Sequence, residues 1–283
     1  MRKQILFALM IAAAAACHRT VPTASEVVAV KVAAIPAAPG DAAWATVPEY
    51  TAKLLAQDLV DPRLMKPSTP EVRVRALTDG KELALRLAWA DPVVNDLPGP
   101  GRFLDGCAIQ IPRVLEPNPP DPQMGQAGKT VDIAFWRADW QASVNGRKDS
   151  IQSLYPNAAV DHYPFEAKSL EPGSAAQKEM AARYAPAQAV GNRRVGPRAF
   201  PVEDMIAEGP GTLSPNAGAA SRGGGERTAD GWSVVIVRKV PEGWAPRTRT
   251  QIAFAVWEGS AKEAGARKMR SGWVPLSMKE ATP

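Results

Sequence analysis

The clearest pattern in this chain is a two-residue alternation of apolar and polar positions, which is typical of half-buried β-strands. In residues 71–90 two alternating runs flank Asp79-Gly80, and an Asp-Gly between such runs is the strongest short-range signal of a β-hairpin. Further strands are predicted at 103–112, 129–140, 232–238 and 251–257. Short strands separated by turn residues predict an all-β fold, an antiparallel β-sandwich with immunoglobulin-like layers.

The alternation also predicts which side chains share a face. In the run at 129–140, Val131, Ile133 and Phe135 fall on one face, and Asp132, Ala134 and Trp136 fall on the other. Four tryptophans lie inside the alternating runs, so we expect them in the core: Trp89, Trp136, Trp232 and Trp257.

Residues 166–228 lack this pattern and are expected to form a long excursion with one or two short helices. A helix is predicted to start at Ser174, because Gln177 follows three residues later as a capping-box partner. The run 223–225, three consecutive glycines, is interpreted as flexible coil. A loop of this length is uncommon in a compact domain unless it covers something.

The N-terminus resembles an export signal. Arg2 and Lys3 precede an apolar run at 5–16, which is too short to span a bilayer, so residues 1–16 are predicted to be a signal peptide. Ala14-Ala15-Ala16-Cys17 is similar to a bacterial lipobox, so either Cys17 is lipidated or an ordinary signal is cleaved near Ala16. Residues 17–40 are expected to be a flexible tether before a folded domain at 41–283.

Charge and cysteine content exclude several classes of function. The formal charge of +5 becomes 5 − 2 = +3 once residues 1–16, with Arg2 and Lys3, are removed. This small, scattered excess does not indicate nucleic-acid binding. Cys107 is the only cysteine after position 17 and is interpreted as a small buried apolar residue. The chain has no Cys-x-x-Cys-His motif, which excludes covalent c-type haem attachment.

Conventional catalytic motifs are also missing from the sequence. The chain has two histidines, His18 and His162, which cannot supply a zinc site, and bis-histidine haem ligation is nearly impossible. It has no Gly-x-Ser-x-Gly nucleophile motif. Met124, in the proline-rich loop at 116–125, would by itself fill a gap under a loop, and Lys268 would be a solvated charge on a basic edge.

Several stretches, in their order along the chain from about Asp41, resemble the haem-binding gamma subunit of the ethylbenzene dehydrogenase group. That group lies within the type II dimethyl sulfoxide reductase family of molybdenum enzymes. The stretches are residues 76–91 (ALTDGKELALRLAWAD), 123–125 (QMG), 146–150 (GRKDS), 209–213 (GPGTL), 230–235 (DGWSVV), 254–260 (FAVWEGS) and 267–273 (RKMRSGW).

The resemblance implies a β-sandwich that holds one non-covalent haem b between a methionine and a lysine. By position these axial ligands are Met124 and Lys268. A thioether is a soft donor that raises the reduction potential, and an amine can bind iron only when it is neutral. Met269 is a rival thioether, but adjacent residues on a strand point to opposite faces. Arg147 and Arg270 are candidate partners of the haem propionates.

The implied function is electron transfer without catalysis by this chain. The protein would be an exported, periplasmic subunit that relays electrons between a carrier such as cytochrome c and the iron–sulfur subunit of a complex with a molybdopterin catalytic subunit. A lipid anchor on Cys17 departs from the family pattern and would tether it to a membrane. Two alternatives stay open: a haem-free carbohydrate- or ligand-binding β-sandwich lipoprotein, and a structural subunit that kept the fold and lost the haem.

Overall fold

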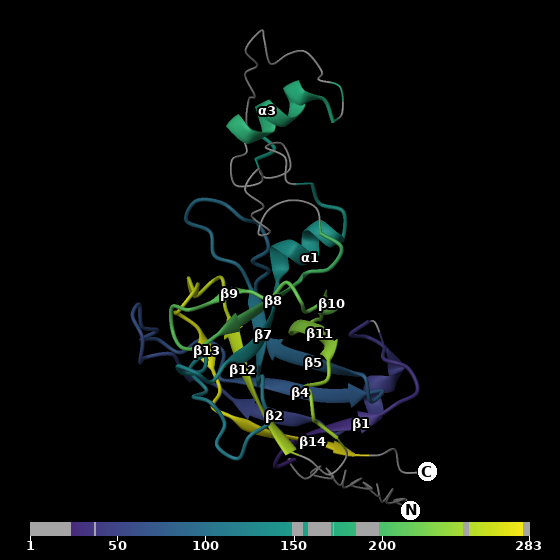
Figure 1. Ribbon diagram of the computed structural model, residues 1–283. Helices are drawn as coiled ribbons and strands as arrows, with labels where there is room; N and C mark the ends of the chain where they lie inside the picture. The colour runs from purple at the N-terminus through teal and green to yellow at the C-terminus, as the bar shows by residue number, and fades with distance from the viewer. Residues whose placement is uncertain are drawn as a thin grey trace, which may run out of the picture.

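The computed structural model describes residues 24–36, 38–148, 155–157, 171, 173–184, 198–245 and 249–279. Its strands form one continuous sheet that folds into a sandwich of two layers (Figure 1). The first layer follows the order β10 (Arg222–Arg227), β11 (Gly231–Lys239), β5 (Glu82–Ala90), β4 (Glu71–Thr78), β1 (Val27–Lys31) and β14 (Val274–Lys279), with β2 (Tyr50–Lys53) beside β4. The predicted hairpin is confirmed as β4 and β5, which pair antiparallel.

The second layer contains the strands that position the site described below. It follows the order β12 (Arg249–Trp257), β6 (Gly106–Pro112), β7 (Val131–Arg137), β8 (Val202–Ala207) and β9 (Ser214–Pro215). The short strand β13 (Met269–Arg270) joins β12 to β3 (Leu55–Ala56). Strand β12 belongs to both layers, because residues 249–252 pair with β14 and residues 253–257 pair with β6.

Strand β1 corrects two predictions. It lies inside residues 17–40, which were expected to be a flexible tether, and it pairs with both β4 and β14. Both pairings are parallel, so the sheet is mixed and not purely antiparallel. The predicted all-β sandwich is confirmed. The sequence did not indicate β1 because a strand buried between two neighbours is apolar on both faces and does not alternate.

Within the described residues, three short helical segments accompany the sheet: η1 (Ala42–Thr46), α1 (Ala138–Val144) and α3 (Ala175–Tyr184). The helix predicted at Ser174 is confirmed as α3, where Ser174 Oγ accepts the Gln177 N–H at 3.2 Å. The strand predicted at 129–140 ends three residues early, because α1 begins at Ala138. Helix α3 stands clear of the sandwich, beyond α1 (Figure 1).

The core lies between the two layers and contains three of the four predicted tryptophans. Trp89, Trp136 and Trp232 are buried there, and the Trp136 ring stands edge-on to the other two at centroid distances of 6.2 and 5.1 Å. The predicted faces of β7 are confirmed, since Ala134 and Trp136 belong to this core while Val131, Ile133 and Phe135 form a cluster on the opposite face. Trp257 is the exception: it is half-buried and belongs to that second cluster.

The expected excursion at 166–228 is corrected in its second part, which contains β8, β9 and β10. The three glycines interpreted as flexible coil lie in β10, paired with β11. Glycine is depleted in strands and normally argues against one. Here the absence of a side chain is required, because a Cβ on Gly225 would lie 2.5 Å from the Trp136 ring.

This contact predicts different effects for two neighbouring substitutions. Gly225→Ala should lower the free energy of unfolding by about 1–3 kcal/mol, since the added methyl overpacks the core against Trp136. Gly224→Ala is the matched control, because the nearest atom to its Cβ is a Gln141 oxygen at 3.9 Å. Urea unfolding of both variants measures the difference, and equal stabilities would contradict the close approach to Trp136.

Candidate functional site

The outer face of the second layer carries a pocket of about 750 Å³, within the size range typical of small-molecule and cofactor sites. Its floor is the apolar outer face of β6, β7, β8 and β12, including Ala108, Ile133, Phe135, Met205 and Ala255. Loops at 102–104, 122–124, 210–213 and 263–266 form its rim. Segments distant in the sequence therefore enclose one apolar cavity.

The proline-rich loop at 116–125 brings Met124 to the pocket. Met124 has a φ of 72°, in the left-handed region that costs a non-glycine residue roughly 1 kcal/mol or more. Two contacts hold the loop there: the Gly209 N–H, just after β8, donates to the Met124 carbonyl at 2.8 Å, and the Gln110 side-chain amide, on β6, donates to the Pro122 carbonyl at 3.0 Å. The loop thus presents the thioether in a constrained position.

Lys268 reaches the same pocket from the opposite end of the chain. It directly precedes β13, and its carbonyl accepts the Gln57 N–H at 3.0 Å. The next residue, Met269, is only 1% exposed and lies in the core between the layers. The structure therefore separates the two side chains as strand geometry requires, with Lys268 lining the pocket and Met269 facing away from it.

The two predicted ligand residues meet in this pocket. Lys268 Nζ lies 3.9 Å from Met124 Sδ, across 144 positions of sequence, and 5.4 Å from the centre of the Trp257 ring. No carboxylate in the described part of the chain forms an ion pair with Lys268. Burial, with a smaller contribution from the Arg270 charge, lowers the pKa of Lys268 to about 8. The proton is therefore lost from this amine more easily than from an ordinary lysine, and its loss frees the lone pair to bind a metal.

The predicted arginines are not both at the site. Arg270 lines the pocket, and its Nε is buried without a hydrogen-bond partner among the described residues. Arg147 lies outside the pocket lining, with its guanidinium 3.2 Å from the Asp96 carboxylate and donating to the Asp96 carbonyl at 2.6 Å. The interpretation of Arg147 as a partner of a pocket ligand is corrected, because the guanidinium is engaged elsewhere.

Two other arginines, which the sequence analysis missed, line the pocket: Arg102 and Arg137. The alternation of side chains could have placed Arg137 at the pocket, because it follows Phe135 by two positions on β7 and so shares its face. With Lys268 and Arg270 they make four cationic side chains in the lining, against the two acids Asp61 and Glu263. The lining is cationic overall and suits a ligand with anionic groups.

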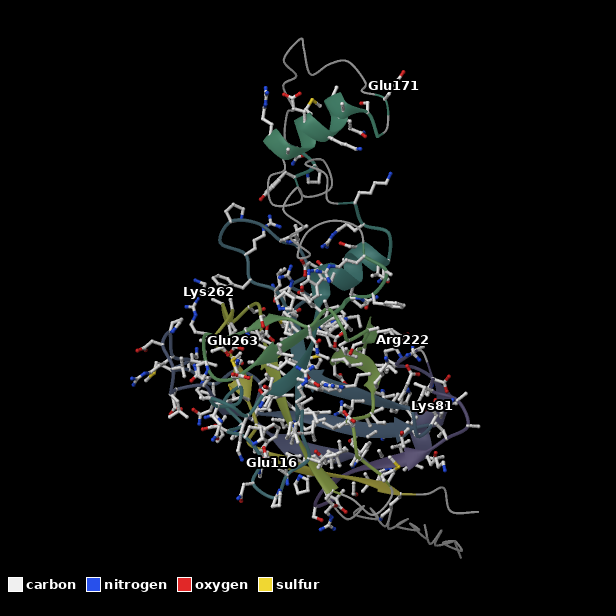
Figure 2. All side chains as sticks on the ribbon, viewed as in Figure 1. Lys81, Glu116, Glu171, Arg222, Lys262 and Glu263 are labelled. Atoms are coloured by element: carbon white, nitrogen blue, oxygen red, sulfur yellow. The ribbon has the colours of Figure 1, made fainter. Side chains whose placement is uncertain are left out.

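A second thioether, Met205 on β8, also lines the pocket and is 6% exposed. It is the cross-strand partner of Ile133, which places it on the floor. The sequence analysis missed it because it lies in the region interpreted as a long loop. Glu263, on the loop that follows β12 beside the exposed Lys262 (Figure 2), is 1% exposed, and burial raises its pKa.

Several predictions concern residues outside those described. They are the signal peptide at 1–16, the lipidated Cys17, and the histidines His18 and His162. Within the described residues, no helix combines the length and apolar character needed to cross a membrane. Cys107 is a free, fully buried thiol in the core, as predicted, and burial raises its pKa.

The depressed pKa of Lys268 predicts a pH dependence of stability in the ligand-free protein. Between pH 8 and pH 10.5 the unfolded chain retains a proton on Lys268 that the folded protein has released, so the free energy of unfolding rises with pH over this window. Lys268→Met should remove this rise and stabilise the protein below pH 8 by at most about 3 kcal/mol. Urea unfolding at several pH values measures it.

The control for this experiment is Lys262→Met, which changes an exposed lysine on the neighbouring loop (Figure 2). This variant should keep the wild-type pH profile. A profile of Lys268→Met that runs parallel to the wild type would contradict the burial of the Lys268 amine.

Comparisons with known proteins indicate the family of the chain. Residues 41–269, which include Met124 and Lys268, match the ethylbenzene dehydrogenase family model. The chain is 24% identical over 248 residues to a protein of Haloferax mediterranei named as a respiratory nitrate reductase heme subunit, covering 84% of this chain and 67% of that protein. It is also 24% identical over 275 residues to the chlorate reductase subunit gamma of Ideonella dechloratans, covering 93% of this chain and 90% of that one.

Among solved structures, the chain is similar to a family 9 carbohydrate binding module of Caldicellulosiruptor kristjanssonii in complex with cellotriose. The TM-score is 0.43 at 10% identity, over 90% of this chain and 94% of that one. A likeness of this degree supports no functional conclusion. The match to the family model, by contrast, spans most of the folded chain, and the chain belongs to the ethylbenzene dehydrogenase family.

Proposed function

We propose that this protein binds one haem b non-covalently in the pocket and acts as an electron-transfer subunit of a reductase complex of the dimethyl sulfoxide reductase type. The observation that carries the proposal is the approach of Lys268 Nζ to Met124 Sδ, 3.9 Å apart in an apolar pocket of about 750 Å³. The names of the two relatives support it, since one is called a heme subunit and both are called subunits of reductases.

The donor set fits an iron porphyrin. An amine and a thioether suit iron, and neither is an oxygen ligand of the kind that calcium or magnesium prefers. The half-buried lysine has no carboxylate partner among the described residues, whereas a lysine that only stabilised the fold would be paired or fully solvated. The apolar floor on β6, β7, β8 and β12 can pack against a flat macrocycle and exclude water.

Each side chain has a defined part in binding. Burial lowers the pKa of Lys268 to about 8, so little free energy is needed to remove its proton and expose the lone pair. The constrained loop orients Met124 before any ligand arrives. Arg270 and Arg102, on the pocket lining, are the candidate partners of the propionates, because guanidinium groups bind carboxylates. Bound haem supplies one-electron redox chemistry at a potential set largely by its axial ligands.

The proposal also includes partners and a cellular location. We propose that the protein passes electrons between the iron–sulfur subunit of a complex with a molybdopterin catalytic subunit and a carrier such as cytochrome c. The name of the gamma subunit of chlorate reductase supports membership in a complex of several subunits. The basic and apolar sequence at 1–16 supports export to the periplasm, where lipidation of Cys17 would anchor the protein to a membrane.

The position of the tryptophans disfavours the alternative of a haem-free carbohydrate-binding module. Sugar recognition needs exposed aromatic faces, and Trp89, Trp136 and Trp232 are buried between the layers. Trp257 does line the pocket, but Lys268 lies over its ring. This pocket therefore offers a cation and a thioether where a sugar-binding site would present an open platform.

Visible spectra of the protein exported in haem-replete cells test the ligand assignment. The wild type should show a low-spin b-type spectrum, oxidised and reduced. Met124→Leu and Lys268→Ala should each disturb it, and loss of the thioether should lower the reduction potential by on the order of 100 mV, within the roughly 0.8 V range that axial ligands span. Spectroscopy and potentiometric titration measure both effects.

Met205→Leu is the matched control, because it removes the second thioether of the same pocket. It should leave the spectrum unchanged. If Met205→Leu disturbs the spectrum and Met124→Leu does not, the thioether ligand is Met205 on β8 and not Met124. The absence of a Soret band after haem reconstitution of the wild type would overturn the proposed function.

A further inference from the structure

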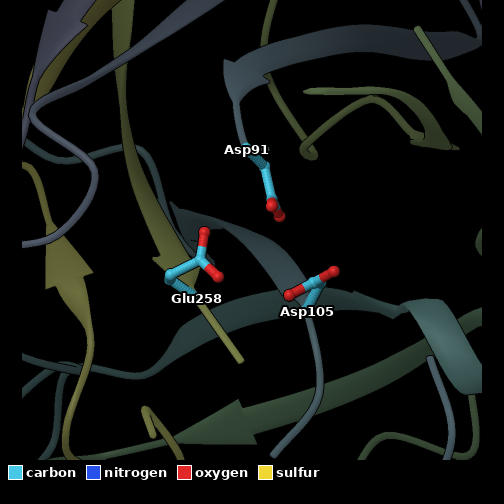
Figure 3. Close-up of side chains that lie close together, drawn as sticks. All are labelled: Asp91, Asp105 and Glu258. Atoms are coloured by element: carbon cyan, nitrogen blue, oxygen red, sulfur yellow. The ribbon is translucent and has the colours of Figure 1, made fainter. Parts of the chain in front are cut away.

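A cluster of three buried carboxylates lies where strands of both layers begin or end. Asp91 directly follows β5, Asp105 directly precedes β6, and Glu258 directly follows β12. Figure 3 shows the three side chains converging, and one ligand oxygen from each lies within 4.8 Å of the others. Asp91 and Asp105 are 0% exposed and Glu258 is 8% exposed, so water cannot screen these charges freely.

Local backbone hydrogen bonds fix the orientation of Asp91 and Glu258. One oxygen of Asp91 accepts the Val93 N–H at 3.0 Å, and one oxygen of Glu258 accepts the Ser260 N–H at 3.0 Å. Each contact closes a tight local turn between a residue and its second neighbour. The carboxylates are therefore held by the strand ends that carry them and not by one another.

Asp105 is held by three donors from other parts of the chain. The Asn95 N–H donates to it at 2.8 Å, the Gly259 N–H at 3.0 Å and the Trp232 indole N–H at 3.0 Å. Donors of this kind favour the ionised form of a carboxylate. Burial nevertheless raises the pKa of Asp105, and the three donors only partly offset this effect. Through these contacts Asp105 links the indole of a core tryptophan to the turn after β12.

One oxygen in the cluster is unpartnered. Asp91 Oδ2 is buried and has no hydrogen-bond partner among the described residues, and the Asp91 carboxylate points toward Asp105 and Glu258 (Figure 3). Arg227 Nη1 lies 3.9 Å from the other Asp91 oxygen, and this is the one ion pair of the cluster within the described residues. Burial together with the charges of Asp105 and Glu258 raises the pKa of Asp91 to about 7. Uncompensated charge of this kind is costly, and either a proton or a bound cation removes that cost.

We propose that Asp91, Asp105 and Glu258 form a binding site for one calcium ion. All the ligand atoms are carboxylate oxygens, the hard donors that calcium and magnesium prefer. Three atoms no more than 4.8 Å apart lie within 4.8 Å/√3, about 2.8 Å, of a common point. Calcium–oxygen distances of about 2.3–2.6 Å need little contraction from this arrangement, whereas magnesium would require about 2.0–2.1 Å and regular octahedral geometry.

The ion would connect strand ends from the two layers. It would join the ends of β5, in the first layer, and of β6 and β12, in the second. Residues next to two of its ligands belong to the pocket lining, since Leu104 precedes Asp105 and Trp257 precedes Glu258. A calcium ion would therefore stabilise the sandwich and one margin of the pocket, whatever ligand the pocket binds.

Thermal unfolding of the full chain, freed of metal with a chelator, tests the site. Calcium at a hundredfold excess over its Kd should raise the Tm by roughly 5–10 °C. Asp91→Asn keeps the shape of the side chain and removes one buried charge. Its metal-free Tm should match or exceed that of the metal-free wild type, and calcium should no longer raise it. Asp91→Asn should therefore lose the calcium response without losing stability, and a folding defect would instead lower the metal-free Tm.

Terbium provides a second readout, because it replaces calcium at oxygen sites and emits when a nearby indole is excited. Trp232 donates to Asp105, so excitation of tryptophan should produce terbium emission in the wild type that calcium competes away. Asp91→Asn should lose most of this emission. Asp204→Asn is the control, because both Asp204 oxygens are engaged by Ser221 outside the cluster; it should lower the Tm and keep the calcium response.

Three results would overturn the proposal. They are a metal-free wild type whose Tm does not respond to millimolar calcium, an Asp91→Asn variant that keeps the full calcium shift, and a wild type that responds equally to calcium and magnesium. The first two would show that the cluster is neutralised by protons and Arg227. The third would show a site without the size selectivity that the oxygen spacing implies.

Discussion

The structure depends on strand β12, which serves both layers of the sandwich. Its first half pairs with β14 and its second half with β6, so two layers are one folded sheet. Its inner face contributes Ile252, Phe254 and Val256 to the core, and its outer face contributes Ala253, Ala255 and Trp257 to the pocket. Glu258, at its end, belongs to the carboxylate cluster. One strand therefore couples core packing, pocket shape and the position of a buried charge.

The molecule carries two buried polar features of opposite sign. In the pocket, Lys268 and Arg270 lie near a thioether without a paired carboxylate among the described residues, and the lysine pKa falls. At the strand ends, Asp91, Asp105 and Glu258 converge with one ion pair in the described part of the chain, from Arg227 to Asp91, and the pKa of Asp91 rises. Both shifts arise mainly from desolvation of the charged form. Such arrangements reduce stability, and proteins usually retain them where a ligand or metal supplies the missing partner.

The alternation of side chains predicted β6, β7 and β12 of the second layer, including both faces of β7, although it placed Trp257 of β12 in the core. It failed where a strand does not alternate. Strand β1 is buried between two neighbours, and β10 contains three glycines because the Trp136 ring leaves no room for a Cβ at Gly225. The β-propensity of each residue and the two-residue alternation describe an average strand environment. Strands β1 and β10 instead depend on the particular strands and side chains beside them. Because β8 was predicted to be part of a long loop, Met205 was not considered as a candidate ligand.

The sequence by itself determined the all-β class, the core faces of the alternating strands and, through a family resemblance, the pair Met124 and Lys268. These follow from local periodicity and from motifs, which are properties of neighbouring residues. Only the tertiary structure decided that the amine and the thioether lie 3.9 Å apart, that Arg147 binds Asp96 instead of lining the pocket, and that three separated acids meet. Contacts between segments far apart in sequence depend on strand order and sheet curvature, which no local pattern encodes.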